Sequence, residues 1–382
     1  MKKVLVGLSG GVDSAVAAYL LKEQGYDVTC CFMRNWDSLT NQDILGNPTL
    51  NNEICTQEAD YNDALSVANK LGLELLRVDF IQEYWDNVFE SFLSEYKRGR
   101  TPNPDILCNK YIKFSKFFDY AMERGFDYIA TGHYAAIDHE TGSLLKAHDL
   151  NKDQSYFLAQ VDRTVLDKVL FPLGEIDKTE VRRIALDLDL DIALKKDSTG
   201  ICFIGERNFK EFLDNYLPSK RGNIISVIDK KVVGEHSGVL YYTIGQRKGL
   251  GIGGDMGPWF VVGKNIYTNE LYVSNQEEDR WLLCEYAYIT DVNWLRVIEE
   301  NSLDCKGKFR YRQNDIDVRI EKIEEGLKVI FDKPLKSVTP GQQAVFYLND
   351  VVIAGGVIDQ VFYDNMSLDE RLGELTNGEK NN

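Results

Sequence analysis

The sequence has no long apolar run and no excess of positive charge. None of its apolar stretches approaches the roughly 20 residues that a membrane-spanning helix requires, so we expect no membrane partner. A formal net charge of −16 disfavours unselective nucleic-acid binding, because neutralising phosphates takes clustered Lys and Arg side chains. A polynucleotide partner would have to be bound by a local basic patch. The first residues already form an apolar run rather than a signal or transit segment, so we expect a cytoplasmic location.

Cysteine patterns that bind metals are also missing. None of the seven cysteines belongs to a Cys-x-x-Cys pair and the histidines form no cluster, so we expect neither zinc nor an iron–sulfur cluster. An odd number of cysteines without a secretion signal favours reactive or buried thiols over a disulfide framework. Cys108 and Cys202 lie in loop-like segments, and Cys55 receives no role. We expect the others to be buried: Cys30, Cys31, Cys284 and Cys305.

A glycine turn close to the first residue is the strongest local signal. It follows the apolar run Val4–Val6 and precedes a helix-forming stretch that begins at Ser14. A strand, a tight turn and a helix in this order bring backbone N–H groups and the positive end of a helix dipole to the carboxyl edge of a sheet, where anions bind. The turn lacks the Gly-Lys-Ser/Thr ending of a Walker A loop, so it has no lysine of its own for a transferring phosphate.

This turn resembles the PP-loop of ATP pyrophosphatases, which is written Ser-Gly-Gly-x-Asp-Ser. Those enzymes bind the β- and γ-phosphates of ATP as a leaving group and transfer AMP. A purely structural glycine turn is the alternative. The resemblance implies ATP binding by Gly7, Leu8, Ser9, Gly10, Gly11, Val12, Asp13 and Ser14, with Asp13 also binding Mg²⁺.

The predicted secondary structure changes along the chain. Strands alternate with helices over residues 1–205, which predicts an α/β domain with a doubly wound, mostly parallel sheet. Residues 206–281 contain short β-type runs, one of them at Val239–Tyr242, among glycine-rich turns. Six short β-type runs over residues 282–363 predict a small C-terminal β-barrel, and residues 364–382 form a tail.

One predicted barrel strand, Gly307–Arg312, suggests a local basic patch. Basic residues alternate along this stretch, so the two-residue period of a strand puts them on one face. A solvated strand face without a partner is the alternative interpretation. The alternating residues are Lys306, Lys308, Arg310 and Arg312.

The segment around Cys108 combines a thiol with a carboxyl group. We expect a loop over Gly99–Cys108 and a helix from about Lys110, so that Cys108 lies at the helix N-terminus. That position and a neighbouring lysine lower a thiol pKa and favour the thiolate. Asp105 precedes Cys108 by three residues and can act as a general acid or base beside it.

Together these segments resemble the tRNA-specific 2-thiouridylases, the MnmA family, over nearly the whole chain. The resemblance implies a PP-loop domain, a small central domain and a C-terminal barrel. It implies ATP- and Mg²⁺-dependent replacement of oxygen by sulfur at C2 of the wobble uridine in tRNAs for Lys, Glu and Gln. It also implies a sulfur donor, either a cysteine desulfurase or a persulfide relay protein. Besides the PP-loop, the motifs that carry the resemblance are Asn103-Pro104-Asp105-x-x-Cys108-Asn109, Thr131-Gly132-His133-Tyr134, Lys152–Leu158, Gly200–Gly205 and Thr243–Ile252.

The resemblance also assigns roles to single residues. Cys202 would carry sulfur as a persulfide, and Cys108 would attack that persulfide and release the sulfur, leaving a Cys108–Cys202 disulfide to be reduced. Disulfide formation needs the two Cα atoms within roughly 7 Å at that step. Asp105 would take part in proton transfer. The remaining matches assign ATP contacts to Met33 and Gly132, target-base contacts to Asn103, Pro104 and Asp105, and tRNA contacts to Lys152, Asp153, Gln154, Arg310 and Tyr311.

Two other functions stay open from the sequence. A PP-loop ligase or amidotransferase that adenylates a small molecule would need neither the paired loop cysteines nor a basic barrel strand. An RNA-binding module with a vestigial nucleotide fold would have no use for the complete PP-loop motif. His133 is either a nucleotide contact or a histidine satisfied within its own loop. Gly245–Gly254 is either a tRNA-contact loop or an interdomain hinge.

Overall fold

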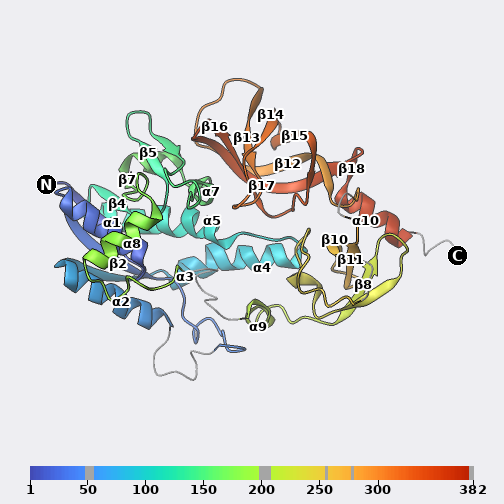
Figure 1. Ribbon diagram of the computed structural model, residues 1–382, viewed down its shortest axis with the longest axis horizontal. Coiled ribbons are helices and arrows are strands. Elements are labelled where there is room, and N and C mark those ends of the chain that lie inside the picture. Colours follow the sequence, from blue (N-terminus) through green and yellow to red (C-terminus); the bar gives the residue numbers. More distant parts are fainter. Residues whose placement is uncertain (48–55, 198–207, 254–256, 277–278, 378–382) are drawn as a thin grey trace.

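The computed structural model describes residues 1–47, 56–197, 208–253, 257–276 and 279–377 (Figure 1). The predicted persulfide residue Cys202, its Gly200–Gly205 segment and Cys55 lie outside the described residues. None of the described helices combines the length and the apolar character that a bilayer crossing requires.

A five-stranded parallel sheet forms the first part of the chain, as predicted. Its strands are β1 (Lys3–Gly7), β2 (Asp27–Arg34), β3 (Glu74–Asp79), β4 (Tyr128–Ala130) and β7 (Val169–Leu170). Their order is β3-β2-β1-β4-β7, and every neighbouring pair is parallel. The carboxyl ends of β1 and its two neighbours therefore meet at one edge.

Helices cover both faces of this sheet. One group consists of α1 (Val12–Glu23), α2 (Thr56–Leu71) and α8 (Lys178–Asp187). The other consists of α3 (Ile81–Tyr84), η2 (Trp85–Phe89), α4 (Glu90–Lys97), α5 (Pro104–Cys108), η3 (Asn109–Lys116) and α6 (Phe117–Glu123). Neighbouring strand residues point to opposite sides. On β1, Val4 and Val6 accordingly pack in the core with the first group, whereas Leu5 packs with the second.

The predicted loop over Gly99–Cys108 is wrong in its second half, where α5 begins at Pro104. Asn103 Oδ1 accepts a hydrogen bond from the Asp105 N–H at 3.2 Å, and proline suits the first helical position. The helical path continues directly into the π-helical η3. Cys108 thus ends α5, is only 3% exposed, and does not lie at a helix N-terminus. The helix-dipole argument for a thiolate at this position does not apply.

A second sheet, with strand order β10-β11-β8-β9, follows α9 (Phe209–Asp214). Its strands are β8 (Gly222–Ser226), β9 (Val232–His236), β10 (Phe260–Asn265) and β11 (Glu270–Ser274). The predicted strand at Val239–Tyr242 is wrong, because η5 (Val239–Tyr241), a short 3₁₀-helix, occupies this stretch. Val239 at its start and Tyr242 directly after it are both buried, and a spacing of three residues suits a helical turn.

The last part of the chain is a closed six-stranded antiparallel barrel, as predicted. Its strands are β12 (Leu283–Trp294), β13 (Ser302–Lys308), β14 (Ile316–Ile323), β15 (Gly326–Lys336), β16 (Gln343–Leu348) and β17 (Val351–Tyr363). The order is β12-β15-β14-β13-β16-β17, and β17 pairs back onto β12. The short β18 (Met366–Ser367) and the helix α10 (Leu368–Asn377) follow, and α10 lies between the barrel and the second sheet (Figure 1).

A hairpin from the first part of the chain extends the barrel sheet. Its strands, β5 (Ala136–Asp138) and β6 (Ser143–Leu145), pair with each other, and Leu145 of β6 pairs with Val351 of β17. The hairpin is followed by α7 (Ser155–Leu158) and η4 (Arg163–Lys168). Tyr156 in α7 donates from its hydroxyl to the Gln343 carbonyl at 3.0 Å. The segment between β4 and β7 therefore joins the parallel sheet to the barrel.

The connection from α4 to α5 also contacts the barrel. The Thr101 N–H donates to the Pro340 carbonyl at 3.2 Å, and Gln342 Nε2 donates to the Thr101 carbonyl at 2.7 Å. Arg100 Nη1 donates to Asp359 Oδ1 at 2.6 Å. These bonds fix the backbone that leads into α5.

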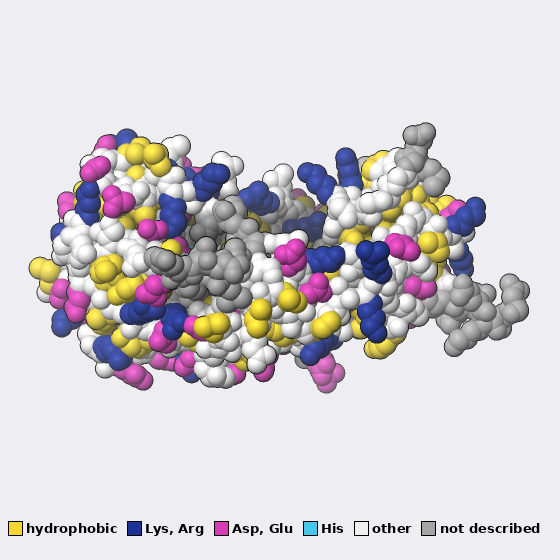
Figure 2. Space-filling view, turned by 90° about the horizontal axis from the view of Figure 1, so that it is seen from below, with side chains coloured by type: hydrophobic (Ala, Val, Ile, Leu, Met, Phe, Trp, Pro, Cys, Tyr) yellow, Lys and Arg dark blue, Asp and Glu magenta, His cyan; other side chains and the backbone are white. Residues whose placement is uncertain are grey.

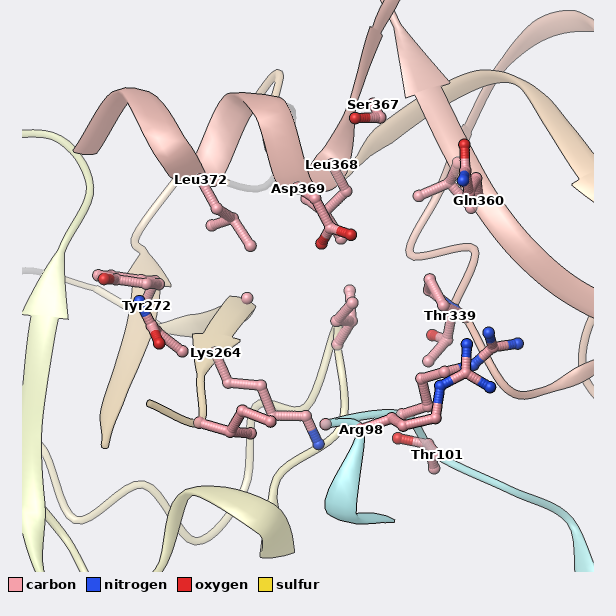
Figure 3. Close-up of a pocket in the computed structure, with 18 of the residues that line it drawn as sticks. Arg98, Thr101, Lys264, Tyr272, Thr339, Gln360, Ser367, Leu368, Asp369 and Leu372 are labelled. Atoms are coloured by element: carbon pink, nitrogen blue, oxygen red, sulfur yellow. The ribbon is translucent and has the colours of Figure 1, made fainter. Parts of the chain in front are cut away.

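The same connection also lies beside the second sheet. Together with the barrel, the two line a cavity of about 590 Å³ where the three parts of the chain meet (Figure 3). A Cβ on Gly99 would lie 3.1 Å from Ile266 Cγ2 and 3.9 Å from Lys264 Cε. Lys264 Nζ donates to the Tyr242 carbonyl at 2.8 Å, and burial lowers the pKa of this ammonium to about 7. The entry to α5 is therefore held from two sides.

Candidate active site

The PP-loop turns from β1 into α1 and is fixed by its two serines. The Ser9 N–H donates to Ser14 Oγ at 3.1 Å, and the Ser14 hydroxyl donates to the Gly11 carbonyl at 3.1 Å. Gly10 has a φ of +74°, and a Cβ there would lie 2.3 Å from the carbonyl oxygen of Asp60 in α2. Only glycine fits this position. The loop thus lies at the first turn of α1, the positive end of the helix dipole.

The two predicted ATP contacts outside the loop, Met33 and Gly132, both pack against it. Met33 lies near the end of β2, and its Cε is 3.1 Å from the position that a Cβ on Gly7 would take. Gly132 follows β4, and a Cβ there would lie 2.7 Å from Ser14 N and 2.8 Å from the carbonyl carbon of Asp13. The structure therefore brings these residues to the carboxyl edge of the sheet beside α1, where nucleotides bind in open α/β sheets.

Replacing Gly132 with alanine is expected to weaken ATP binding by roughly tenfold or more and to cost about 1–3 kcal/mol of folding free energy, because the added methyl collides with the backbone of α1. Calorimetric titration with ATP and thermal unfolding measure the two effects. Gly253→Ala is the matched control, since a Cβ there meets nothing within 4 Å. Equal ATP affinity in the two variants would contradict the role of this contact.

Asp13 is engaged by a lysine from α8. Lys178 Nζ donates to the two carboxylate oxygens of Asp13 at 2.7 and 2.8 Å, and the Tyr134 hydroxyl donates to Oδ1 at 2.8 Å. Over the described ranges, no group of three or more His, Cys, Asp and Glu side chains is arranged to hold a metal ion. In this structure the Asp13 carboxylate is thus paired with Lys178 and Tyr134, and its binding of Mg²⁺ together with ATP phosphates stays a prediction.

Asp197 extends this charged cluster. Its Oδ1 lies 2.8 Å from Lys178 Nζ and 2.5 Å from Arg182 Nη2, and its Oδ2 lies 2.9 Å from Lys152 Nζ. Burial opposes ionisation of this carboxyl group. The hydrogen bonds from Lys178 and Lys152 outweigh that effect and hold the pKa of Asp197 well below its ordinary value. The carboxylate is therefore ionised at any physiological pH.

The Cys202 segment lies outside the described residues, between Asp197 and Asn208. Asn208 caps α9, because its Oδ1 accepts from the Lys210 N–H at 3.0 Å. Phe212 of α9 packs against Phe89 with ring centroids 6.0 Å apart, in the core beneath the parallel sheet. Both residues that flank the segment are thus anchored to the first part of the chain, and an approach of Cys202 to Cys108 stays a prediction.

Asp105 and Cys108 lie one helical turn apart on α5, a spacing that puts both on the same side of the helix. Burial raises the pKa of the Asp105 carboxyl, and the charge of Lys113 partly offsets this effect. Burial and the same Lys113 charge also lower the pKa of His133, which adjoins Gly132. The charge of Lys113 therefore acts on both Asp105 of α5 and His133 after β4.

His133 has a hydrogen-bond partner within its own loop. Its Nδ1 lies 2.7 Å from Thr131 Oγ1, and its ring contacts Phe114 and Phe171 at centroid distances of 5.8 and 6.0 Å. Its pKa lies well below the ordinary value of 6.5, mainly because of burial, so the ring is neutral near pH 7. These contacts favour a histidine that is satisfied within its loop.

The predicted tRNA contacts at residues 152–154 differ in exposure. Asp153 is 3% exposed and accepts from the Ala147 N–H at 3.1 Å and the Ser155 hydroxyl at 2.9 Å. Gln154 Oε1 accepts from the Tyr134 N–H at 3.0 Å. Gln154, like Lys152, is partly exposed, and the Lys152 side chain is 40% exposed. Contacts of this segment with tRNA stay a prediction.

The predicted basic strand face in the barrel is wrong. β13 ends at Lys308, because Phe309 turns into the core and its N–H donates to Gln313 Oε1 at 2.9 Å, which closes a turn. Period two along a strand therefore does not extend to residues 310 and 312. Lys306 is also paired, with Asp317 at 2.6 Å.

Arg310 and Tyr311 lie in that turn and contact other parts of the chain. Arg310 Nη2 donates to the Ile244 carbonyl at 2.9 Å and to the Ser337 carbonyl at 2.8 Å. Tyr311 packs on Phe157 of α7 with ring centroids 4.4 Å apart. Arg310 thus joins the barrel to the start of the Gly245–Gly254 loop.

Two lysines lie at the PP-loop that the sequence does not predict there. Lys178 contacts Asp13, and Lys195 Nζ donates to the Gly10 carbonyl at 3.2 Å and to Asp63 at 2.7 Å. Both come from residues more than 160 positions after the loop. Asp177 is the N-cap residue of α8, so the start of this helix is recognisable in the sequence. No local sequence pattern predicts which groups a lysine at that start contacts.

Figure 2 shows Lys and Arg side chains on both sides of a notch between the two lobes of the molecule. Lys and Arg side chains also lie elsewhere on this face, where they are interspersed with Asp and Glu side chains.

Comparison with known proteins assigns the chain to a family. The tRNA-specific 2-thiouridylase MnmA of Mycoplasma capricolum subsp. capricolum is 54% identical over 371 residues, which cover 94% of this chain and 99% of the relative. The chain belongs to the tRNA-specific 2-thiouridylase family. The relative from Staphylococcus carnosus is 53% identical over 365 residues, covering 94% of this chain and 96% of the relative. The predicted family is therefore confirmed.

Three family models match consecutive stretches of this 2-thiouridylase chain. They are described as a tRNA methyl transferase HUP domain (residues 2–206), a tRNA methyl transferase PRC-barrel domain (210–275) and an aminomethyltransferase beta-barrel domain (285–358). The parallel sheet, the four-stranded sheet and most of the closed barrel fall into these stretches in turn.

Proposed function

We propose that this chain is a tRNA-uridine 2-sulfurtransferase, which replaces oxygen by sulfur at C2 of a wobble uridine and releases AMP and pyrophosphate. The observation that carries the proposal is the identity of more than half of all aligned residues with 2-thiouridylases over 94% of this chain and at least 96% of each relative. The assembled PP-loop and the Asp105–Cys108 turn of α5 support it, because they supply the two kinds of chemistry that the reaction needs.

The nucleotide step activates a poor leaving group. The C2 oxygen of uridine attacks the α-phosphorus of ATP, an O–P bond forms, and the bond between the α-phosphorus and the β-phosphate oxygen breaks. The PP-loop N–H groups and the N-terminus of α1 bind the departing pyrophosphate, as helix N-termini bind phosphates. Met33 and Gly132, which pack on the loop, complete the ATP contacts. AMP is then the leaving group at C2.

The sulfur step uses both predicted cysteines. The Cys108 thiolate attacks the sulfur of Cys202 in the Cys202 persulfide, a Cys108–Cys202 disulfide forms, and hydrosulfide leaves. Hydrosulfide adds to C2 of the adenylated uridine and AMP departs. An external thiol reductant then reduces the disulfide. Asp105, one turn from Cys108 and with a raised pKa, transfers the proton at this position.

The finer assignments belong to the same proposal. Asn103, Pro104 and Asp105 contact the extruded base, and extrusion costs a few kcal/mol that base contacts return. The substrates are tRNAs for Lys, Glu and Gln, and the segment of Lys152, Asp153 and Gln154 and the Arg310–Tyr311 turn contact them. The sulfur donor is a cysteine desulfurase or a persulfide relay protein. The chain consists of a PP-loop domain (1–205), a central domain (206–281), a barrel (282–363) and a tail (364–382).

Incubation with unmodified glutamate tRNA, ATP, Mg²⁺ as its counterion and a persulfide donor, followed by nucleoside mass analysis, tests the proposal. We expect a 2-thiouridine nucleoside and tRNA-dependent pyrophosphate release. Absence of thiolated uridine where a characterised relative produces it would contradict the proposal. Pyrophosphate release that needs a small molecule rather than tRNA would favour the ligase alternative, and no release at all would favour the RNA-binding module.

A further inference from the structure

The Lys178 ammonium is confined at the PP-loop by carboxylates. It is 2.7 and 2.8 Å from the two oxygens of Asp13 and 2.8 Å from Asp197 Oδ1, and the residue is only 9% exposed. Lysine is seldom this buried unless it is paired. Asp13 belongs to the first turn of α1, so the ammonium lies at the anion-binding end of that helix.

The cluster around Lys178 combines cations with carboxylates. Lys178, Lys152 and Arg182 face Asp13 and Asp197, and the Lys178 N–H also donates to Asp149 Oδ2 at 3.1 Å. Within this cluster the Lys178 ammonium contacts Asp13 of the PP-loop, so a triphosphate at the loop would meet it directly, and charge-assisted hydrogen bonds to phosphate are among the strong ones.

The PP-loop itself contains no lysine, although it has to stabilise a departing pyrophosphate. We propose that Lys178 is the phosphate-binding lysine of the ATP site, that it contacts the β- and γ-phosphate oxygens that leave as pyrophosphate, and that Asp197 is the positioning residue that holds its ammonium at the loop. The inference rests on the proposed function and adds a residue to it. An ammonium group has three donors, so Lys178 exchanges one carboxylate contact for phosphate and keeps the others.

Asp13 acquires a different role from the one the sequence predicts. With both of its oxygens bound by Lys178, its carboxylate orients a cation supplied by the protein. The positive charge that a Walker A loop carries in its own sequence is supplied here by α8, which packs beside α1 in the same core.

Affinities for inorganic pyrophosphate, ATP and AMP, measured by calorimetry on the full chain without tRNA, test the inference. Lys178→Met is expected to weaken pyrophosphate and ATP binding by roughly 10- to 100-fold and AMP binding by less than about threefold, because AMP lacks the contacted phosphates. Lys178→Arg keeps the charge and should recover most of the pyrophosphate affinity. Asp197→Asn should weaken pyrophosphate binding by a smaller factor, roughly three- to tenfold, since Lys178 stays tethered by Asp13.

The control variant is Lys70→Met, which removes an ammonium that lies 2.7 Å from the exposed Asp189 at the far end of α2. It should bind all three ligands like the wild type.

If Lys178→Met leaves Asp13 unpaired and fails to fold, the double variant Asp13→Asn, Lys178→Met removes both charges. The ratio of pyrophosphate affinity to AMP affinity is then measured on the double variant. Equal losses for pyrophosphate and AMP, or no loss, would overturn the role of Lys178 while leaving the sulfurtransferase proposal intact. A wild type that binds neither ATP nor pyrophosphate would overturn the sulfurtransferase proposal itself.

Discussion

Cys108→Ser is expected to lower tRNA thiolation by roughly 10³-fold or more while tRNA-dependent pyrophosphate release persists. A hydroxyl at this position cannot attack a persulfide sulfur, whereas adenylation of uridine needs only the PP-loop and its neighbours. The tRNA adenylate should therefore accumulate or be hydrolysed. Nucleoside mass analysis measures the first activity, and a coupled phosphate assay measures the second.

Cys31→Ser is the matched control for that variant. Cys31 is buried in the same hydrophobic core as Cys108, and burial raises the pKa of its thiol to about 12, which keeps it protonated and unreactive. Both substitutions bury a hydroxyl in this core, so any common loss of stability appears in both. Thiolation should survive in Cys31→Ser. If the two variants lost thiolation alike, or if Cys108→Ser lost pyrophosphate release as well, Cys108 would be a packing residue.

The parts of the fold that follow from local patterns were predictable. The apolar runs of β1 and β2, the glycine turn after β1 and the alternation of strands and helices predict a doubly wound sheet, because each pattern acts within a few residues. The start of α5 was less accessible, although its signal is local. Asn103 before Pro104 is a capping residue followed by a favoured first helical residue, whereas a second proline close by, Pro102, also favours the predicted loop.

The composition of the site depends on long-range contacts that no local pattern contains. Lys178 reaches Asp13 across 165 positions, and Arg310 reaches the Ile244 carbonyl across 66. The basic strand failed as a prediction for a related reason. Alternation of charge at 306, 308, 310 and 312 is a local signal, but the burial of Phe309 decides where β13 ends. Residues such as Met33, Gly132 and Cys202 are assigned to the site only by the family resemblance, because no local pattern marks them.

Asp105→Asn is expected to reduce the thiolation rate by roughly 10²- to 10⁴-fold, the usual contribution of a positioned proton-transfer group. It should also change the pH dependence. Burial raises the pKa of Asp105, so wild-type activity that needs the ionised carboxylate falls as the pH drops through a value above the ordinary 3.8 of aspartate. Asparagine does not titrate, so this acid limb should vanish from the rate profile measured under single-turnover conditions.

Stability provides the control for the same variant. A carboxyl whose folded pKa is raised contributes stability that is fully present below its unfolded pKa and is lost as the pH rises through its folded pKa. Asp105→Asn escapes that loss, so at neutral pH the variant should unfold at a temperature no lower than the wild type. Asp119→Asn, an exposed position on α6, should leave rate and pH profile unchanged. An acid limb that persists in Asp105→Asn would assign the titrating group to another residue. If the variant instead unfolded below the assay temperature, the loss of rate would reflect loss of the fold, and Asp105 would be a structural carboxylate.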